Sequence, residues 1–241
     1  MSEKEKALYQ SLVEETKREI NDVVASEGFS KARFKIVTLL TRLRQLCISP
    51  RLLDENYQEE SVKIKRLLDI IKELIKDKHK ILIFSSFKSA VYLVKEALDR
   101  ESISNYVIDG SVKGRDRVAM VDAFNKDKTN CFLITLKSGG TGLNLTSADV
   151  VIHLDIWWTP QAENQATDRA HRIGQTKKVT VLKLINKGTV EEKIIELQEK
   201  KKILSDNLIE GKNVATLDTL TEEELTNLLS IGYETDHNND K

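Results

Sequence analysis

Cysteine, histidine and proline are scarce in this chain of 241 residues, which contains 2 Cys, 4 His and 2 Pro. Cys47 and Cys131 lie far apart in the sequence, which excludes a disulfide scaffold, and the scattered histidines have no zinc-binding spacing. No apolar run approaches the roughly 20 residues of a membrane span. The charged first ten residues lack the apolar segment of a signal peptide. We therefore expect a reducing, intracellular compartment, with no membrane partner and no bound metal centre.

Glycine is limited to 10 residues, too few for a fibrous or low-complexity chain, while 40% of the residues are hydrophobic and 32% are charged. That composition is typical of a globular protein. The zero net charge hides an uneven distribution: Lys and Arg outnumber Asp and Glu by 27 to 20 over residues 61–212, but number 1 against 7 over 213–241. A basic body with an acidic tail fits a polyanion partner. It also fits a solvated face followed by a frayed terminus.

The first 60 residues predict a helical hairpin and a linker. Apolar residues recur at helical spacing through 3–27, and Gly28 indicates the turn that ends this helix. A second helical stripe extends from Ile36 to Ile48. Pro50 ends it, because the residue before a proline avoids the helical region of backbone conformation.

From residue 61 onward, short apolar runs of strand length alternate with helical patterns. Strands are expected at 81–84, 106–108, 131–135, 150–154 and 180–185. Helices are expected at about 64–75, 88–101, 118–124, 160–172, 189–204 and 221–229. Continuous apolar runs indicate strands that are buried on both faces, which predicts an α/β fold with a doubly wound parallel sheet.

Ligands of open α/β sheets bind at the carboxyl ends of the strands, and three segments there contain candidate chemistry. Residues 85–88 read SerSerPheLys, which fits either a helix N-cap or a phosphate cradle made of hydroxyls and backbone N–H groups. Residues 137–145 contain three glycines in four positions, which fits an anion-binding nest or a tight turn. They match neither a dinucleotide fingerprint nor the Walker A pattern, which occurs nowhere in the chain.

The third segment contains a predicted helix that begins near Pro160. Gln165, Arg169 and Arg172 follow at i, i+4 and i+7 and would share one helical stripe. Two guanidinium groups one turn apart repel each other unless an anion or an acid lies between them. Asp168 could supply that acid in a surface ion-pair network, whereas a bound phosphate would make the two arginines a clamp.

Four segments in register resemble the helicase motifs of the Swi/Snf family of DNA-dependent ATPases. Residues 165–175 (QATDRAHRIGQ) resemble motif VI, and residues 135–145 (TLKSGGTGLNL) resemble motif V. Residues 81–87 (ILIFSSF) are similar to motif IV, and residues 108–125 to the segment that follows it. The likeness covers nearly the whole chain, since the family's linker and the C-terminal brace of its bacterial members are similar to 38–53 and 190–211.

One departure from the family is Thr159, which stands where asparagine usually separates the equivalents of Trp158 and Pro160. The family's engines contain two RecA-like lobes, and the first carries the Walker A and Walker B motifs. This chain has neither motif, so the resemblance implies the second lobe alone. We expect a helical hairpin and linker at 1–60, a RecA-like lobe with a helical brace at 61–212, and an acidic, partly disordered tail at 213–241.

The resemblance implies roles at a nucleotide site that is shared with the first lobe. Arg169 and Arg172 would be arginine fingers that reach the phosphates of ATP. Gly142, Asn144 and Gln165 would line the same cleft. ATP with Mg²⁺ would be bound mainly by the missing first lobe, which is the expected partner within the same parent chain.

The resemblance also implies contacts with the backbone of duplex DNA. Hydroxyls, a lysine and the N–H groups of a glycine loop suit contacts that read no sequence. The residues concerned are Ser85, Ser86, Lys137, Ser138 and Gly139, with Trp158 near a groove of the DNA.

The expected function is therefore the second lobe of an ATP-driven duplex-DNA translocase, inactive as a separate fragment. Its location would be cytoplasmic in a prokaryote and nuclear in a eukaryote. Two alternatives stay open at this point. One is a strand-separating helicase or an RNA-polymerase-associated motor. The other is a non-catalytic regulatory interaction module whose cleft is no longer used.

Overall fold

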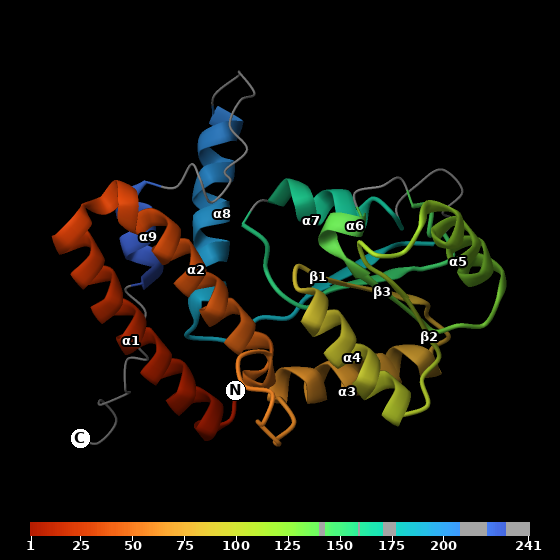
Figure 1. Cartoon of the computed structure of the whole chain (residues 1–241). Helices are drawn as coiled ribbons and strands as arrows, with labels where there is room; N and C mark the ends of the chain where they lie inside the picture. The colour runs from red at the N-terminus through yellow and green to blue at the C-terminus, as the bar shows by residue number, and fades with distance from the viewer. Residues whose placement is uncertain (140–142, 159, 171–176, 208–220, 230–241) are drawn as a thin grey trace, which may run out of the picture.

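The computed structural model of the chain describes residues 1–139, 143–158, 160–170, 177–207 and 221–229. The described part contains a parallel sheet flanked by helices and, beside the sheet, a body made only of helices (Figure 1). No helix in these ranges is long and apolar enough to cross a membrane.

One parallel sheet contains the five predicted strands. They are β1 (Ile81–Ser85), β2 (Asn105–Ile108), β3 (Cys131–Thr135), β4 (Val150–His153) and β5 (Thr180–Lys183). Their spatial order is β2-β3-β1-β4-β5, and every pairing is parallel. The three central strands are buried along their whole length, as their apolar runs predict. The prediction of a doubly wound α/β sheet is confirmed.

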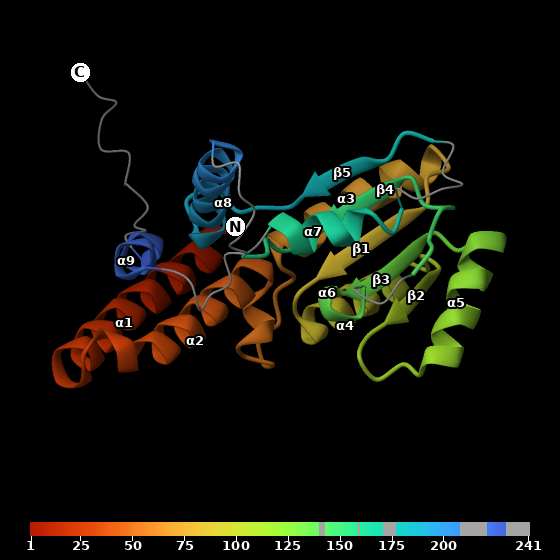
Figure 2. The ribbon, with the colours of Figure 1, turned by 90° about the horizontal axis from the view of Figure 1, so that it is seen from above.

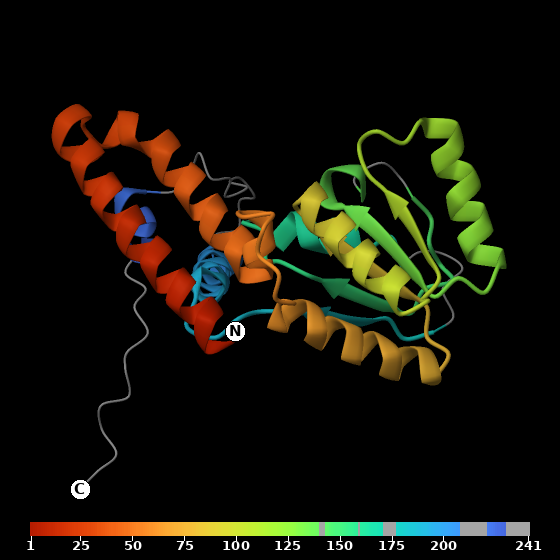
Figure 3. The same cartoon turned by 60° about the horizontal axis from the view of Figure 1, so that its bottom comes forward.

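Helices cover both faces of the sheet (Figures 1 and 2). They are α3 (Val62–Lys76), α4 (Lys88–Arg100), α5 (Gly114–Lys126), the short α6 (Leu136–Gly139) and α7 (Pro160–Thr167). α3 and α4 pack on one face, where Figure 3 shows them side by side, and α5 and α7 pack on the other. Side chains alternate along β1 accordingly, with Ile83 in the first core and Phe84 in the second.

The expectation that all strands are buried on both faces is wrong for the two edge strands, which are β2, where only Ile108 is buried, and β5. In β5, Val181 is 41% exposed. Leu182, the next residue, packs against the core that contains α3 and α4. An edge strand lies partly outside the cover of the flanking helices, so an apolar run there does not require two buried faces.

The helical body is built on the predicted hairpin. Its elements are α1 (Glu3–Glu27), α2 (Phe29–Ile48), α8 (Val190–Asn207) and α9 (Glu222–Leu229). Gly28 joins α1 to α2 with a φ of 80°, a conformation that favours glycine, and α2 therefore begins seven residues before the apolar stripe that predicted it. α2 ends before Pro50, as predicted, and Pro50–Leu52 form a 3₁₀ turn.

The hairpin and the brace share one core. Tyr9 of α1 and Leu43 of α2 are buried with Val190 and Ile194 of α8. Trp158, which follows β4, belongs to the same cluster. The helical body is therefore packed against the segment by which the chain leaves the sheet.

Candidate functional site at the carboxyl edge of the sheet

Three loops meet at the carboxyl edge of the sheet because the strands before them are neighbours. β3, β1 and β4 lie side by side and run parallel. Residues 85–88 join the last residue of β1 to the first residue of α4, β3 is followed by α6, and β4 is followed by the residues that lead into α7. The described parts of the three candidate segments therefore lie together at one edge (Figure 2).

The serine loop, residues 85–86, is organised by one buried carboxylate. The Ser85 hydroxyl donates to Asp155 Oδ1 at 2.6 Å, and the backbone N–H of Ser86 donates to the same oxygen at 3.0 Å. The Ser86 hydroxyl donates to the other oxygen, Oδ2. Arg44 of α2 completes the arrangement, since its Nη2 donates to Asp155 Oδ2 at 2.9 Å and to the Ser86 hydroxyl oxygen at 3.0 Å. Both candidate serines thus have an acceptor inside the protein.

The segment after β3 begins as a helix, where the sequence left an anion nest or a tight turn open. Lys137 of α6 is exposed, while Ser138 is buried and accepts a hydrogen bond from Thr135 Oγ1 at 2.9 Å. α6 ends at Gly139, and the predicted cleft residue Gly142 lies outside the described residues. Asn144 is exposed, and its backbone oxygen accepts a hydrogen bond from Asn125.

The helix predicted over 160–172 ends at Thr167, so the proposed regular stripe of three side chains is wrong at Arg169. The backbone N–H of Arg169 bonds Ala166 O, and that of Ala170 bonds Thr167 O, three residues back in each case. Gln165 is exposed on α7, whereas Arg169 is only 4% exposed. Arg172 lies outside the described residues.

A backbone hydrogen bond joins the two halves of the predicted nucleotide site. The N–H of Leu145 donates to Arg169 O at 3.0 Å. Asn144, the residue before Leu145, and Arg169 are therefore in adjacent segments at the carboxyl edge. Residues expected from two separate motifs are brought together there, although the sequence contains no direct sign of this contact.

Two side chains hold α7 on the sheet. Glu163 accepts hydrogen bonds from the backbone N–H of Trp157 at 2.8 Å and from Lys183 Nζ of β5 at 2.5 Å. His153 of β4 lies 3.3 Å from Thr167 Oγ1 through its Nε2. Burial lowers the pKa of His153 from its usual range, so the imidazole is neutral at neutral pH.

Comparison with known proteins agrees with this geometry. Residues 62–174 match the family model of the helicase conserved C-terminal domain. An uncharacterized ATP-dependent helicase of Mycoplasma pneumoniae is 41% identical over 200 residues, which make up 82% of this chain and 19% of that protein. The C-terminal domain of the Sulfolobus solfataricus SWI2/SNF2 ATPase superposes with a TM-score of 0.75 and 28% identity, over 96% of this chain and 95% of that domain.

A second solved structure is the Sulfolobus solfataricus SWI2/SNF2 ATPase core in complex with dsDNA. The superposition covers 96% of this chain and 48% of the solved core, with a TM-score of 0.76 and 30% identity. This chain is a helicase C-terminal domain of the SWI2/SNF2 family. It spans about a fifth of the curated helicase and about half of the solved ATPase core. The resemblance found in its motifs is confirmed.

Trp158 of this SWI2/SNF2 domain is placed in the interior. Its side chain is buried in the core that α1, α2 and α8 share. The guanidinium carbon of Arg44 lies 5.1 Å from the Trp158 ring centroid. Within the described chain, the indole therefore contributes to the packing of the helical body on the sheet, and it is not a surface group.

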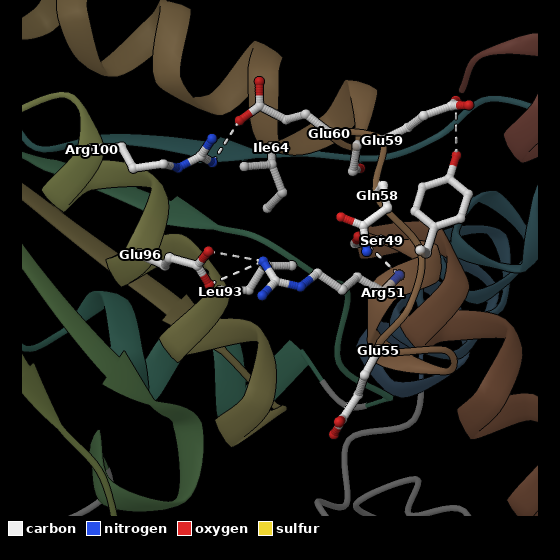
Figure 4. Close-up of a pocket in the computed structure, with 12 residues that line it drawn as sticks. Ser49, Arg51, Glu55, Gln58, Glu59, Glu60, Ile64, Leu93, Glu96 and Arg100 are labelled. Atoms are coloured by element: carbon white, nitrogen blue, oxygen red, sulfur yellow. Dashed lines mark hydrogen bonds and ion pairs between the residues drawn. The ribbon is translucent and has the colours of Figure 1, made fainter.

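A separate hollow of about 280 Å³ lies between the linker and α4 (Figure 4). α4 begins at the carboxyl edge and runs back along the sheet, so Glu96 and Arg100 near its end lie toward the opposite edge. The cations of this hollow are already paired, Arg51 with Glu96 and Arg100 with Glu60. We do not assign the nucleotide to it.

The sequence reasoning missed Arg44 and Asp155. The sequence contains a signal for Asp155, because this acid comes two residues after the end of β4 and directly after the apolar Leu154. Arg44 interrupts the apolar stripe of α2 and is buried. Charged residues are rarely buried unless they are paired. Arg44 and Asp155 could therefore each have been identified as a candidate for a buried ion pair, but the sequence does not indicate that they are partners.

Proposed function

We propose that this domain is the second lobe of an ATP-driven duplex-DNA translocase. It would supply arginine fingers to an ATP site and half of a track for the DNA backbone. ATP with Mg²⁺ would be bound mainly by the first lobe of the parent chain, which we expect to contain the Walker motifs. The observation that carries the proposal is the hydrogen bond of 3.0 Å from Leu145 N to Arg169 O, which joins two motif segments at the carboxyl edge.

The residues of this edge fit the phosphates of a nucleotide. ATP bound between the lobes would supply the phosphoryl group that is transferred. Phosphoryl transfer depends on the position of that group and on the neutralisation of its negative charge. The Arg169 guanidinium is largely buried, and a cation held in a water-poor site acts more strongly on a phosphate than one in bulk water. Asn144 and Gln165 are exposed beside it and offer amide groups to the same cleft.

The neighbouring loops fit a DNA backbone. Lys137 is exposed on α6 and would contact a phosphate directly, with the backbone of Gly139 beside it. Ser85 and Ser86 would act mainly by shaping their loop, because both hydroxyls donate to Asp155. Contacts of this kind read no base sequence, which suits movement along DNA. The solved SWI2/SNF2 core in complex with dsDNA supports this assignment.

The test is the separate replacement of Arg169 and Arg172 by alanine in the full-length parent protein. Turnover should fall by roughly 10³–10⁵, or about 4–7 kcal/mol of barrier, while ATP affinity changes little because the first lobe dominates binding. Lysine at either position should restore little, since a point charge does not reproduce the planar guanidinium. Arg100→Ala is the matched control, because this arginine is exposed and pairs with Glu60 away from the carboxyl edge.

Turnover, nucleotide affinity and melting temperature are measured on the same variants. Near-normal turnover with a lowered melting temperature would give the arginines a structural role only and would overturn the proposal. A strand-displacement assay on the full-length protein decides between translocation along intact duplex and strand separation, the activity suggested by the name of the Mycoplasma relative.

A further inference from the structure

Arg44 is a buried cation at the junction of three parts of the domain. It belongs to α2, yet its side chain is only 4% exposed and leaves the hairpin core toward the sheet. Its guanidinium carbon lies 5.0 Å from the ring centroid of Phe87 and 5.7 Å from that of Trp157. Phe87 follows the serine loop and Trp157 precedes α7, so the cation lies among rings from both loops.

Hydrogen bonds connect the same guanidinium to both loops. Its Nη2 donates to the Ser86 hydroxyl oxygen at 3.0 Å, on the side assigned to DNA. It donates to Asp155 Oδ2 at 2.9 Å and to the backbone oxygen of Ile156 at 2.7 Å, in the segment that leads to α7. Asp155 in turn holds both serines of residues 85–86, so one charged pair fixes the two loops relative to each other.

A series of contacts leads from the Arg44–Asp155 pair toward Arg169. The residue after Ile156 is Trp157, whose backbone N–H donates to Glu163 of α7 at 2.8 Å. α7 ends at Thr167, two residues before Arg169. A shift of the serine loop would therefore change the contacts of Arg44 and Asp155, and these contacts extend through Ile156 to the segment that leads into α7.

We propose that Arg44 is a positioning residue that couples the DNA-side serine loop to α7, so that DNA binding increases ATP turnover through this buried pair. The inference rests on the proposed function and adds a residue that none of the helicase motifs contains. Burial lowers the pKa of Arg44, and the charge of Asp155 opposes that effect. An arginine side chain stays charged in proteins, and a change that separates the pair leaves an uncompensated buried carboxylate.

The alternative is that the pair only holds the hairpin on the sheet. A second buried pair provides the matched control. Lys63 Nζ lies 2.5 Å from Glu191 Oε1 at the start of α8, with side-chain exposures of 4% and 0%, and it also joins the helical body to the sheet. Glu191 contacts Asn186 but neither the serine loop nor α7 in the described hydrogen bonds. Lys63 Nζ also donates to the backbone oxygens of Leu154 and Leu184, at 3.2 and 2.9 Å, so this tether reaches the residue before Asp155. Glu191→Gln therefore removes a charge of equal burial from a tether that shares none of the hydrogen bonds of Arg44 and Asp155.

The experiment uses the full-length parent protein and the variants Arg44→Met, Arg44→Lys and Glu191→Gln. ATP turnover is measured without DNA and with saturating duplex DNA, together with duplex affinity and melting temperature. We expect both Arg44 variants to lower the ratio of DNA-stimulated to basal turnover by about 10-fold, with a much smaller effect on basal turnover. Glu191→Gln should lower the melting temperature and leave the ratio as in the wild type.

Arg44→Lys keeps the positive charge beside Asp155, so this variant tests the coupling even where Arg44→Met does not fold. A wild-type ratio in Arg44→Lys, with or without a lowered melting temperature, would overturn the inference. A loss of duplex affinity with an unchanged ratio at saturating DNA would also overturn it. If Arg172→Ala abolishes turnover while Arg44→Lys keeps the wild-type ratio, only this inference fails. If Arg172→Ala keeps normal turnover, the proposed function itself fails.

Discussion

The hydroxyl of Tyr9 should contribute measurably to stability because it ties the first helix to the brace. Tyr9 lies on α1, and its side chain is buried in the core of the helical body. Its hydroxyl oxygen accepts a hydrogen bond of 2.8 Å from the backbone N–H of Val190, 181 residues further along the chain. Val190 is the first residue of α8, where backbone N–H groups have no partner within the helix.

The substitution Tyr9→Phe removes this acceptor and leaves the ring in place. The Val190 N–H would then be buried without a partner, which costs about 2 kcal/mol. For a chain of this size, a loss of about 2 kcal/mol lowers the melting temperature by roughly 4–8 °C. The cavity left by one hydroxyl is small, so the lost hydrogen bond should account for most of the effect.

Thermal and urea unfolding of the purified chain, followed by circular dichroism, measure the change. Tyr106→Phe is the control, because it deletes a hydroxyl whose hydrogen bond of 2.8 Å to Asp127 is exposed to water. The control should stay within about 0.5 kcal/mol of the wild type. Equal stabilities of Tyr9→Phe and Tyr106→Phe would refute the reasoning, because they would mean that the N–H of Val190 finds another partner at no cost.

Three further predictions concern the chain as a whole. The purified chain should release no phosphate from ATP with or without duplex DNA, because it lacks the Walker motifs, and DNA-stimulated release would contradict the half-site proposal. The chain should bind duplexes of unrelated sequence weakly and with similar affinities. The slope of log K against log salt should be about −3, because we expect ~3–4 phosphate contacts. A strong preference for one sequence would exclude a backbone track. Both thiols should resist alkylation at pH 8, since burial raises the pKa of Cys131 to about 12 and that of Cys47 above its usual range. Iodoacetamide should label them rapidly only in denaturant, and fast labelling of the native chain would contradict their burial.

Local patterns predicted the elements of this fold well. The apolar run at 131–135 forms β3 with those bounds, and α2 ends before Pro50 as the proline requires. Such features depend on residues that are neighbours in the chain: side-chain period, proline geometry and glycine conformation act over a few positions. The helicase motifs were equally visible, because each is a short continuous segment, and the family comparisons confirm what they indicated.

Features that depend on the environment of an element were predicted less well. The helix that begins at Pro160 ends at Thr167, five residues earlier than expected, and the backbone oxygen of Arg169 accepts a hydrogen bond from Leu145 of another segment. The apolar residues of β5 are partly exposed because the strand lies at an edge. Strand order and competing backbone partners are not present in a local pattern.

By itself, the sequence determined which segments are helices and strands, which family the chain resembles and which three loops contain candidate chemistry. Only the tertiary structure decided which of those loops share a partner. Arg44 and Asp155 are 111 residues apart, and nothing in either neighbourhood identifies the other. They meet because β1 and β4 pair in parallel while α2 packs beside the carboxyl edge, and a buried charge is stable only where the fold brings its counterion.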